Sequence, residues 1–356
     1  MKKLFIVILL SFLVVSCWTN KNQQLQPQVE PTNVSVSEPV QEKLLVTSSI
    51  IPLSSAVEAI GGDYVDVNNI IPAWVSPHGF DMSAKQRAIV EDAEIVFFTG
   101  LDHIDGFLEK SVPENLQVHL ADWIELIEIE EHEHHDDHED EHKEDDHHDD
   151  EHEDHHDDNN HKDEHDHVEE DDHEDDEEHD DHHDDHSSDP HVWLGKDNII
   201  AIAKKIEMEL SEKLPEQATY FTENRQKFEN DLNAIYEDFS LKIQGKTPQE
   251  FIIFHDAYNY LFESIGLDRN LKIPFSENIL HDTGTAHMAE LIDEIKLHNI
   301  KHIFREPQFS DSNLQKFVDE YDLQIGTLDP LWTDVSSEGY LKNIQNNLDT
   351  LINIYE

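Results

Sequence analysis

The sequence predicts an α/β protein with two lobes, each a mainly parallel sheet flanked by helices, joined by one long helix. Three observations predict this fold class. Short apolar runs alternate with helix-like stretches over residues 44–122, the same alternation returns after residue 249, and a nearly continuous helical pattern lies between the two regions. Strands separated by helices are typical of parallel sheets, so each alternating region is expected to form one lobe.

Strands of the first lobe are expected at four apolar runs, which are LLVTSSI, YVDVNNII, EIVFFTG and VHLA. Between them, one helix is expected to start at Pro52 and to end at Gly61-Gly62, because proline is favoured at the start of a helix and glycine at its end. A second helix is expected from Ser83 to Asp92.

The second lobe repeats this pattern. Strands are expected at EFIIFHD, near residues 269–273, at HIFRE and at LQIGTLD, and helices near residues 258–265, at 285–298, near 311–320 and at the end of the chain. Asp256, directly after the first of these strands, is available as the N-cap of the helix that follows.

Residues 197–244 show helical spacing of apolar residues throughout, apart from a break at Pro215. Phe221, Phe228, Leu232 and Phe239 continue the pattern after the break. The part after Pro215 is therefore predicted to be the single long helix that joins the lobes.

These patterns divide the chain into segments. They are a lipoprotein signal peptide at 1–17, a flexible tether at 18–43, an N-terminal lobe at 44–214 with a disordered His/Asp/Glu-rich loop at 130–186, a linking helix at 215–245, and a C-terminal lobe at 246–356.

The first residues are typical of a bacterial lipoprotein signal peptide. Lys2 and Lys3 precede a short apolar stretch from Leu4 to Val15, and the motif VVSC resembles a lipobox, whose cysteine carries a diacylglycerol after cleavage. Cys17 is the only cysteine, so disulfides play no part in the fold. We expect an exported protein that is anchored by lipid at the cell envelope, on the periplasmic or outer face of a membrane, without spanning it.

The charge distribution excludes nucleic acid as a partner. The formal net charge is -57, and residues 130–186 hold 34 of the 81 acidic residues. So negative a surface repels phosphate backbones, and no basic cluster stands out beyond the first few residues. The protein is expected to be a monomer.

Four candidate metal ligands stand beside turn signals, each near the C-terminal end of a predicted strand, where open α/β sheets place their ligand sites. His78 lies in IPAWVSPHGFD, where two prolines restrict the backbone. His191 lies in SSDPHVWLG, where ordered sequence resumes after the acidic run. His255 follows the strand FIIF, and Asp329 ends a strand in TLDPLW, ahead of a proline.

Three imidazoles and one carboxylate would make the four-coordinate shell that zinc prefers, whereas manganese favours more oxygen ligands. Each residue also has a purely structural reading. His191 could be the last of the histidine run, His255 a structural histidine, and Asp329 only a turn starter.

The motifs PHGFD, DPHVWL, FHDAYNYL, IFREPQFS and TLDPLW occur in this order around an acidic, histidine-rich insertion. Together they resemble the cluster A-I solute-binding proteins of ABC importers, and most closely the zinc-uptake, ZnuA-like subgroup, over residues 44–356. The resemblance implies a metal in a cleft between two lobes, little lobe closure, and delivery to an ABC permease driven by its ATPase.

The resemblance also assigns roles by position. His78, His191 and His255 match the family's metal-binding histidines, and Asp329 matches the second-lobe aspartate that completes the shell in many members, where others use a nearby acidic residue or water. Histidine at 255 favours zinc, because manganese-type members tend to carry glutamate there. Glu306 is expected to orient a ligand imidazole by hydrogen bonding and not to bind the metal.

The acidic loop contains 18 of the 27 histidines. Paired imidazoles beside carboxylates are expected to bind several zinc ions weakly and to collect zinc for the cleft. The candidate low-affinity positions are His134, His135, His147, His148, His155, His156, His182 and His183.

The alternatives differ in cargo and role. Manganese is the second candidate for the metal, and a zinc-buffering surface adhesin is the second candidate for the role. A zinc hydrolase would use three histidines with an open fourth position, but the sequence shows no HExxH helix and no serine or cysteine nucleophile arrangement. We expect no enzyme activity.

Overall fold

The computed structural model describes residues 42–129, 188–275, 285–308 and 314–356. The predicted signal peptide, nearly all of the tether and the whole histidine-rich loop lie outside these ranges. Residues from Glu42 to Glu356 group into one compact unit, so the lobe boundaries predicted within it stay a prediction.

The first sheet is parallel and has the order β2-β1-β3-β4. Its strands are β1 (Leu44–Ser48), β2 (Val65–Asn69), β3 (Ile95–Phe98) and β4 (Gln117–His119). Ser48 pairs with Asn69 on one side and with Phe97 on the other. The carboxyl ends of these strands therefore lie at one edge of the sheet.

The second sheet is also parallel and repeats this order as β6-β5-β7-β8. Its strands are β5 (Phe251–Ile253), β6 (Lys272–Pro274), β7 (His302–Arg305) and β8 (Gln324–Thr327). The fold class predicted from the sequence is confirmed, and each predicted strand is found within a few residues of its place.

Helices connect and cover the strands. They are α1 (Ile51–Gly61), α2 (Ala84–Glu91), α3 (Lys196–Lys213), α4 (Ala218–Ile243), α5 (Asn259–Ser264), α6 (Thr285–His298), α7 (Leu314–Tyr321) and α8 (Gly339–Leu351). Helix α2 starts where predicted because Ser83 and Gln86 form a capping box. Helix α1 ends at Gly61 because Gly62 has a φ of +52°, which a residue with a side chain rarely adopts.

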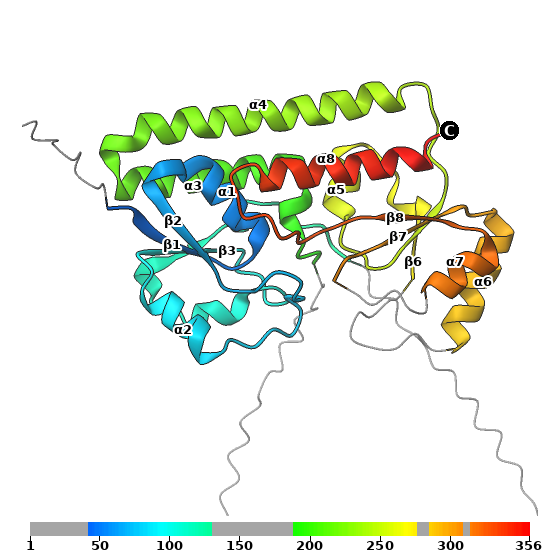
Figure 1. Ribbon diagram of the computed structural model, residues 1–356, viewed down its shortest axis with the longest axis horizontal. Helices are drawn as coiled ribbons and strands as arrows, with labels where there is room; N and C mark the ends of the chain where they lie inside the picture. The colour runs from blue at the N-terminus through cyan, green and yellow to red at the C-terminus, as the bar shows by residue number, and fades with distance from the viewer. Residues whose placement is uncertain (1–41, 130–187, 276–284, 309–313) are drawn as a thin grey trace, which may run out of the picture. The chain divides into compact units, whose positions relative to one another are not determined.

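The predicted linking helix is α4, whose start is preceded by a 3-10 turn at Pro215–Gln217. It packs against α1, α3 and α8, so it runs over helices from both halves of the unit (Figure 1). Among the described residues, no helix combines the length and the apolar composition needed to cross a membrane.

The second sheet buries both of its faces because its side chains alternate. Phe251, Ile253 and Phe304 join the large core that also contains the buried residues of α1, α3, α4 and α8. Ile252 and Ile303 point the other way into a smaller core with α6 and α7. Packing on both faces therefore fixes the ends of β5 and β7, and with them the start of the segments that follow.

One local expectation is wrong. Asp256 does not cap α5, whose N-cap residue is Tyr258 and carries no side-chain capping bond. The Asp256 carboxylate instead accepts a hydrogen bond from the Lys272 ammonium on β6. A charged partner on the neighbouring strand competes successfully with backbone amides for this carboxylate.

Candidate metal centre

His78 lies in a tight turn on the loop between β2 and α2. The Phe80 amide donates to the Pro77 carbonyl oxygen at 3.0 Å, and Gly79 has a φ of +74°. A turn with a positive φ at its third residue favours glycine there. The backbone of the turn therefore explains why glycine follows His78. His78 is thereby presented at the tip of a restrained turn.

His191 lies just before a 3-10 turn at Val192–Leu194 that leads into α3. The Asp189 carboxylate accepts hydrogen bonds from both the backbone amide of His191, at 2.9 Å, and its Nδ1, at 2.8 Å. Both residues are buried. Asp189 thus fixes the backbone and the ring of His191 together.

His255 follows β5 by two residues, at the carboxyl edge of the second sheet. Its Nδ1 lies 3.3 Å from Oε1 of Glu306, which directly follows β7. Strands β5 and β7 are neighbours, and β5 is the strand at which the sheet order reverses, so the pair lies at the switch point typical of ligand sites in open α/β sheets. This contact agrees with the orienting role expected for Glu306.

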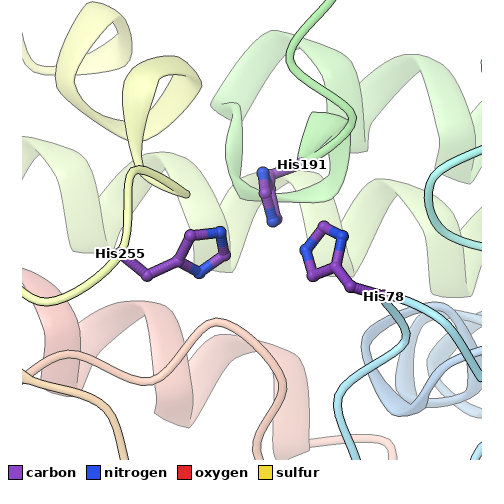
Figure 2. A group of neighbouring side chains, drawn as sticks. All are labelled: His78, His191 and His255. Atoms are coloured by element: carbon purple, nitrogen blue, oxygen red, sulfur yellow. The ribbon is translucent and has the colours of Figure 1, made fainter. Parts of the chain in front are cut away.

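The three imidazoles converge in space although they come from three separate segments (Figure 2). The ring centroids are 5.4 Å apart for His78 and His191, 5.4 Å for His78 and His255, and 4.8 Å for His191 and His255. One ligand atom from each lies within 4.8 Å of the other two. Such a triangle can close on one metal ion by small ring movements.

The outward contacts decide which nitrogen each ring offers to a metal. Nδ1 of His191 and Nδ1 of His255 face carboxylates, and the His78 ring is hydrogen bonded to the backbone of His103. Nε2 of His78 is buried without a hydrogen-bond partner. The arrangement thus leaves Nε2 of each ring available to a metal ion. Asp189, Glu306 and the backbone of His103 contact the rings on their other sides and fix their orientation.

Electrostatics favour a neutral imidazole at His78 and an ionised carboxylate at Asp189. Burial, reinforced by the nearby His191 and His255, lowers the pKa of His78 to about 3, so this ring is neutral at pH 7 and ready to coordinate. Burial alone would raise the pKa of Asp189, but its hydrogen bonds and charge interaction with His191 outweigh that effect and hold the pKa below its usual value. Asp189 stays ionised beside the site.

The cavity enclosed by the triad is small. Its volume is about 10 Å³, which is close to the space that one water molecule needs. Its lining includes Trp193, Pro330 and Leu331 as well as the three histidines. A cavity of this size accommodates a single ion and no small-molecule substrate.

Asp329 is placed near the triad but outside the cluster of potential ligand atoms. Its Oδ1 accepts hydrogen bonds from the side-chain amide of Gln308 at 2.7 Å and from the amides of Leu331 and Trp332 at 3.1 and 2.9 Å. Gln308, and not Asp329, lines the cavity among the described residues. Asp329 as a metal ligand therefore stays a sequence-based prediction.

Sequence reasoning did not identify Asp189, His103 or Gln308. A signal for Asp189 was present, because an aspartate two residues before a buried histidine can bond both its amide and its ring. His103 contacts His78 through its backbone, which every residue type has, so the identity of residue 103 gives no signal.

Cys17 and the candidate loop histidines lie outside the described residues. Glu128 and Ser188, on either side of the loop, pair in an antiparallel bridge that brings the two ends of the loop together.

Comparison with known proteins places this geometry among metal-binding proteins. The family described as zinc-uptake complex component A, periplasmic (ZnuA) matches residues 46–354. The high-affinity zinc uptake system protein ZnuA of Haemophilus influenzae is 32% identical over 323 residues, covering 88% of this chain and 94% of that protein.

Solved structures share the fold at lower identity. A ZnuA crystal structure aligns with a TM-score of 0.65 at 22% identity, over 88% of this chain and 99% of that one. The solute-binding protein FpvC of Pseudomonas aeruginosa, in complex with Mn²⁺, aligns with a TM-score of 0.63 at 19% identity, over 88% and 98%. Proteins of this fold thus include at least one crystallised with manganese, so the fold alone does not determine the metal.

Proposed function

The chain belongs to the ZnuA family of zinc-uptake components, and from this premise we propose that it is the extracytoplasmic protein that binds zinc and delivers it to an ABC permease. The proposal describes a transport component and not an enzyme. Zinc is its cargo and is released unchanged.

The observation that carries this proposal is the convergence of one ring nitrogen from each of three histidines at a cavity with room for one ion. Carboxylates contact the far sides of His191 and His255. Aromatic nitrogen donors in a closed cavity suit a borderline-soft divalent cation, whereas an enzyme would need space for a substrate and an activated water. The site is therefore one for holding an ion.

Zinc is favoured over manganese by the donor set. All three converging side chains offer imidazole nitrogen, while manganese prefers carboxylate, carbonyl and water oxygens. The histidine at 255 is decisive here, because it directs a ring nitrogen and not a carboxylate oxygen into the cavity. Manganese stays the alternative cargo, to be tested by competition.

Lipid anchoring is proposed from the sequence alone. The VVSC motif assigns the lipid to Cys17, which would place the zinc site on the outer side of a membrane beside the permease. A Cys17→Ser variant should leave the membrane fraction and fail to incorporate labelled fatty acid. Retention of that variant in the membrane fraction would argue for another anchor.

The histidine-rich loop is proposed to collect zinc for the cleft. The bridge between Glu128 and Ser188 brings the ends of the loop together close to Asp189, which contacts the ligand His191. Deletion of residues 132–186 keeps this bridge, so the variant should fold and bind cleft zinc. The deletion should lower zinc uptake only when zinc is scarce. Unchanged uptake under scarce zinc would exclude the collecting role.

The central experiment is competitive zinc titration of the soluble form without residues 1–17. The loop-deleted variant should retain one tight zinc, and His255→Ala should weaken it, with His298→Ala as a control because His298 lies on α6 and contacts Glu250 and Glu294 instead. A loop-deleted protein that binds no zinc tightly, or that prefers manganese, would contradict the proposed site or cargo.

The role in import requires a cell-based test. A strain without the protein should grow poorly when zinc is chelated and recover with added zinc. Growth that does not depend on zinc would instead favour the buffering or adhesin role, for which the described residues provide no specific observation.

A further inference from the structure

Gln308 is a polar residue of the cavity lining that the metal site described above does not explain. It follows Glu306 by two residues on the segment after β7, and its side chain lines the same cavity as the three histidines. Its Nε2 donates to Oδ1 of Asp329 at 2.7 Å. Its Oε1 is buried and has no hydrogen-bond partner among the described residues.

The Asp329 carboxylate determines the orientation of this amide. An ionised carboxylate only accepts hydrogen bonds, so the NH₂ group of Gln308 must face Asp329. The carbonyl oxygen is at the other corner of the planar amide and therefore faces away from Asp329. Because Gln308 lines the cavity and Asp329 does not, we infer that this oxygen faces the cavity.

Asp329 is itself held in place. Its Oδ1 accepts the Leu331 and Trp332 amides, and its backbone carbonyl oxygen accepts hydrogen bonds from the side chains of Asn343 and Asn347 at 2.7 and 2.9 Å. Both asparagines lie on α8. Helix α8 thus positions Asp329, and Asp329 positions Gln308.

The same arrangement occurs at two of the histidines. Asp189 contacts the far nitrogen of His191 and Glu306 contacts the far nitrogen of His255, just as Asp329 contacts the far corner of the Gln308 amide. In each case a carboxylate contacts one side of a planar group, and all three planar groups line the cavity. Among the described residues, neither Nε2 of His78 nor Oε1 of Gln308 has a hydrogen-bond partner, although both atoms are buried, and one cation would satisfy both.

We propose that Gln308 supplies the fourth contact to the bound metal through its carbonyl oxygen, and that Asp329 acts on Gln308 and not on the ion. The inference rests on the proposed zinc-binding function. The cavity has a volume of about 10 Å³, close to the space that one water needs, so an ion that fills it would adjoin the amide. The shell is then three imidazole nitrogens and one neutral oxygen. The carboxylates of Asp189, Glu306 and Asp329 contact His191, His255 and Gln308.

The test compares Gln308→Ala, Gln308→Glu and Asp329→Ala with the control Gln345→Ala, which removes an exposed glutamine from α8. Zinc affinity is measured on the form lacking residues 1–17 against a strong chelator, so that only the tight site is counted. The visible spectrum of the Co²⁺-loaded proteins reports the ligand set, and urea unfolding of the metal-free proteins reports folding.

We expect Gln308→Ala to weaken zinc by about 10- to 100-fold and to change the Co²⁺ spectrum, while Gln308→Glu, which retains an oxygen donor, stays closer to the parent. Asp329→Ala should weaken zinc in the parent but add little to Gln308→Ala, because residues that act through one contact are not additive.

Three results would overturn the inference, and they are distinguishable. Zinc affinity unchanged in Gln308→Ala, with His255→Ala still weakening it, would overturn the role of Gln308 and leave the proposed function standing. The same would follow if Asp329→Ala abolished tight binding in either background. A parent protein with no tight zinc that depends on His255 would overturn the proposed function and this inference with it.

Discussion

The indole Nε1 of Trp193 donates a hydrogen bond to the carbonyl oxygen of Pro330 at 2.8 Å. Trp193 follows the ligand His191 by two residues, and Pro330 follows Asp329. The bond therefore joins the segment that carries His191 to the loop after β8, in which Asp329 contacts Gln308. The Tyr340 hydroxyl on α8 adds a hydrogen bond to the Trp193 carbonyl oxygen, so the two walls of the cavity are linked at its base.

This link predicts that Trp193→Phe weakens both fold and zinc binding. The substitution leaves the Pro330 carbonyl oxygen buried without its donor, which costs about 1–3 kcal/mol, and it loosens the cavity wall. Urea unfolding and zinc titration measure the two effects. Trp123→Phe is the control, because Trp123 is 73% exposed. Equal behaviour of the two variants would show that the indole bond does not hold the walls together.

Asp189→Asn is predicted to lower zinc affinity by about tenfold, as for other partners of metal-bound histidines. Asparagine has the same size but lacks the charge that supports His191 as a metal ligand. The measurement is competitive zinc titration, with Asp231→Asn as the control on the exposed surface of α4. Zinc affinity equal to the parent would mean that the Asp189 charge is not needed.

Gly79→Ala is predicted to destabilise the protein by about 1 kcal/mol, because its φ of +74° strains any residue with a Cβ although nothing lies within 4 Å. Since Gly79 shapes the turn that carries His78, zinc affinity should fall as well. Gly245→Ala is a matched control, with a φ of +77° and equally open space between α4 and β5.

The two glycine variants should lose similar stability, measured by urea unfolding, but only Gly79→Ala should bind zinc more weakly. Loss of zinc affinity in both variants would point to a general effect of destabilisation and not to the His78 turn.

The buried His302 on β7 predicts a loss of stability in acid. Burial lowers its pKa in the folded protein below the ordinary value of 6.5, only partly opposed by the charge of Glu356. The unfolded chain therefore takes up a proton first as the pH falls, so the contribution of His302 to stability is fully present above pH 6.5 and is lost below it.

His302→Gln, which cannot titrate, should lose less stability than the parent between pH 7.5 and pH 5, with both proteins kept metal-free by a chelator. The measurement is the free energy of urea unfolding at each pH. Parallel pH profiles would show that another group accounts for the acid sensitivity.

Much of the fold could be predicted from local patterns. Helix α6 occupies the predicted range of 285–298, α1 ends at the predicted glycine, and α2 starts directly after Ser83, where the predicted segment begins. These features depend on neighbours in the chain, on apolar spacing and on capping residues, which the sequence displays directly. Asp256 was assigned wrongly because its partner Lys272 lies on another strand.

The convergence of His78, His191 and His255 could also be anticipated, but only because the ordered motifs resemble a known family. Spacing alone left a structural reading open for His191 and His255. The structure adds what motifs do not contain, namely which nitrogen faces the centre and which group lies behind each ring.

The sequence by itself determined the fold class, the positions of the elements and the three histidines, since these follow from local periodicity, turn residues and recognisable motifs. Only the tertiary structure decided that Gln308 and not Asp329 lines the cavity, that Asp189 orients the imidazole of His191, and that Trp193 bonds to Pro330. Such relationships depend on hydrogen-bond geometry between segments far apart in the chain. Distances of a few ångströms across the cavity are set by the packing of two sheets and their helices, which residue order does not reveal.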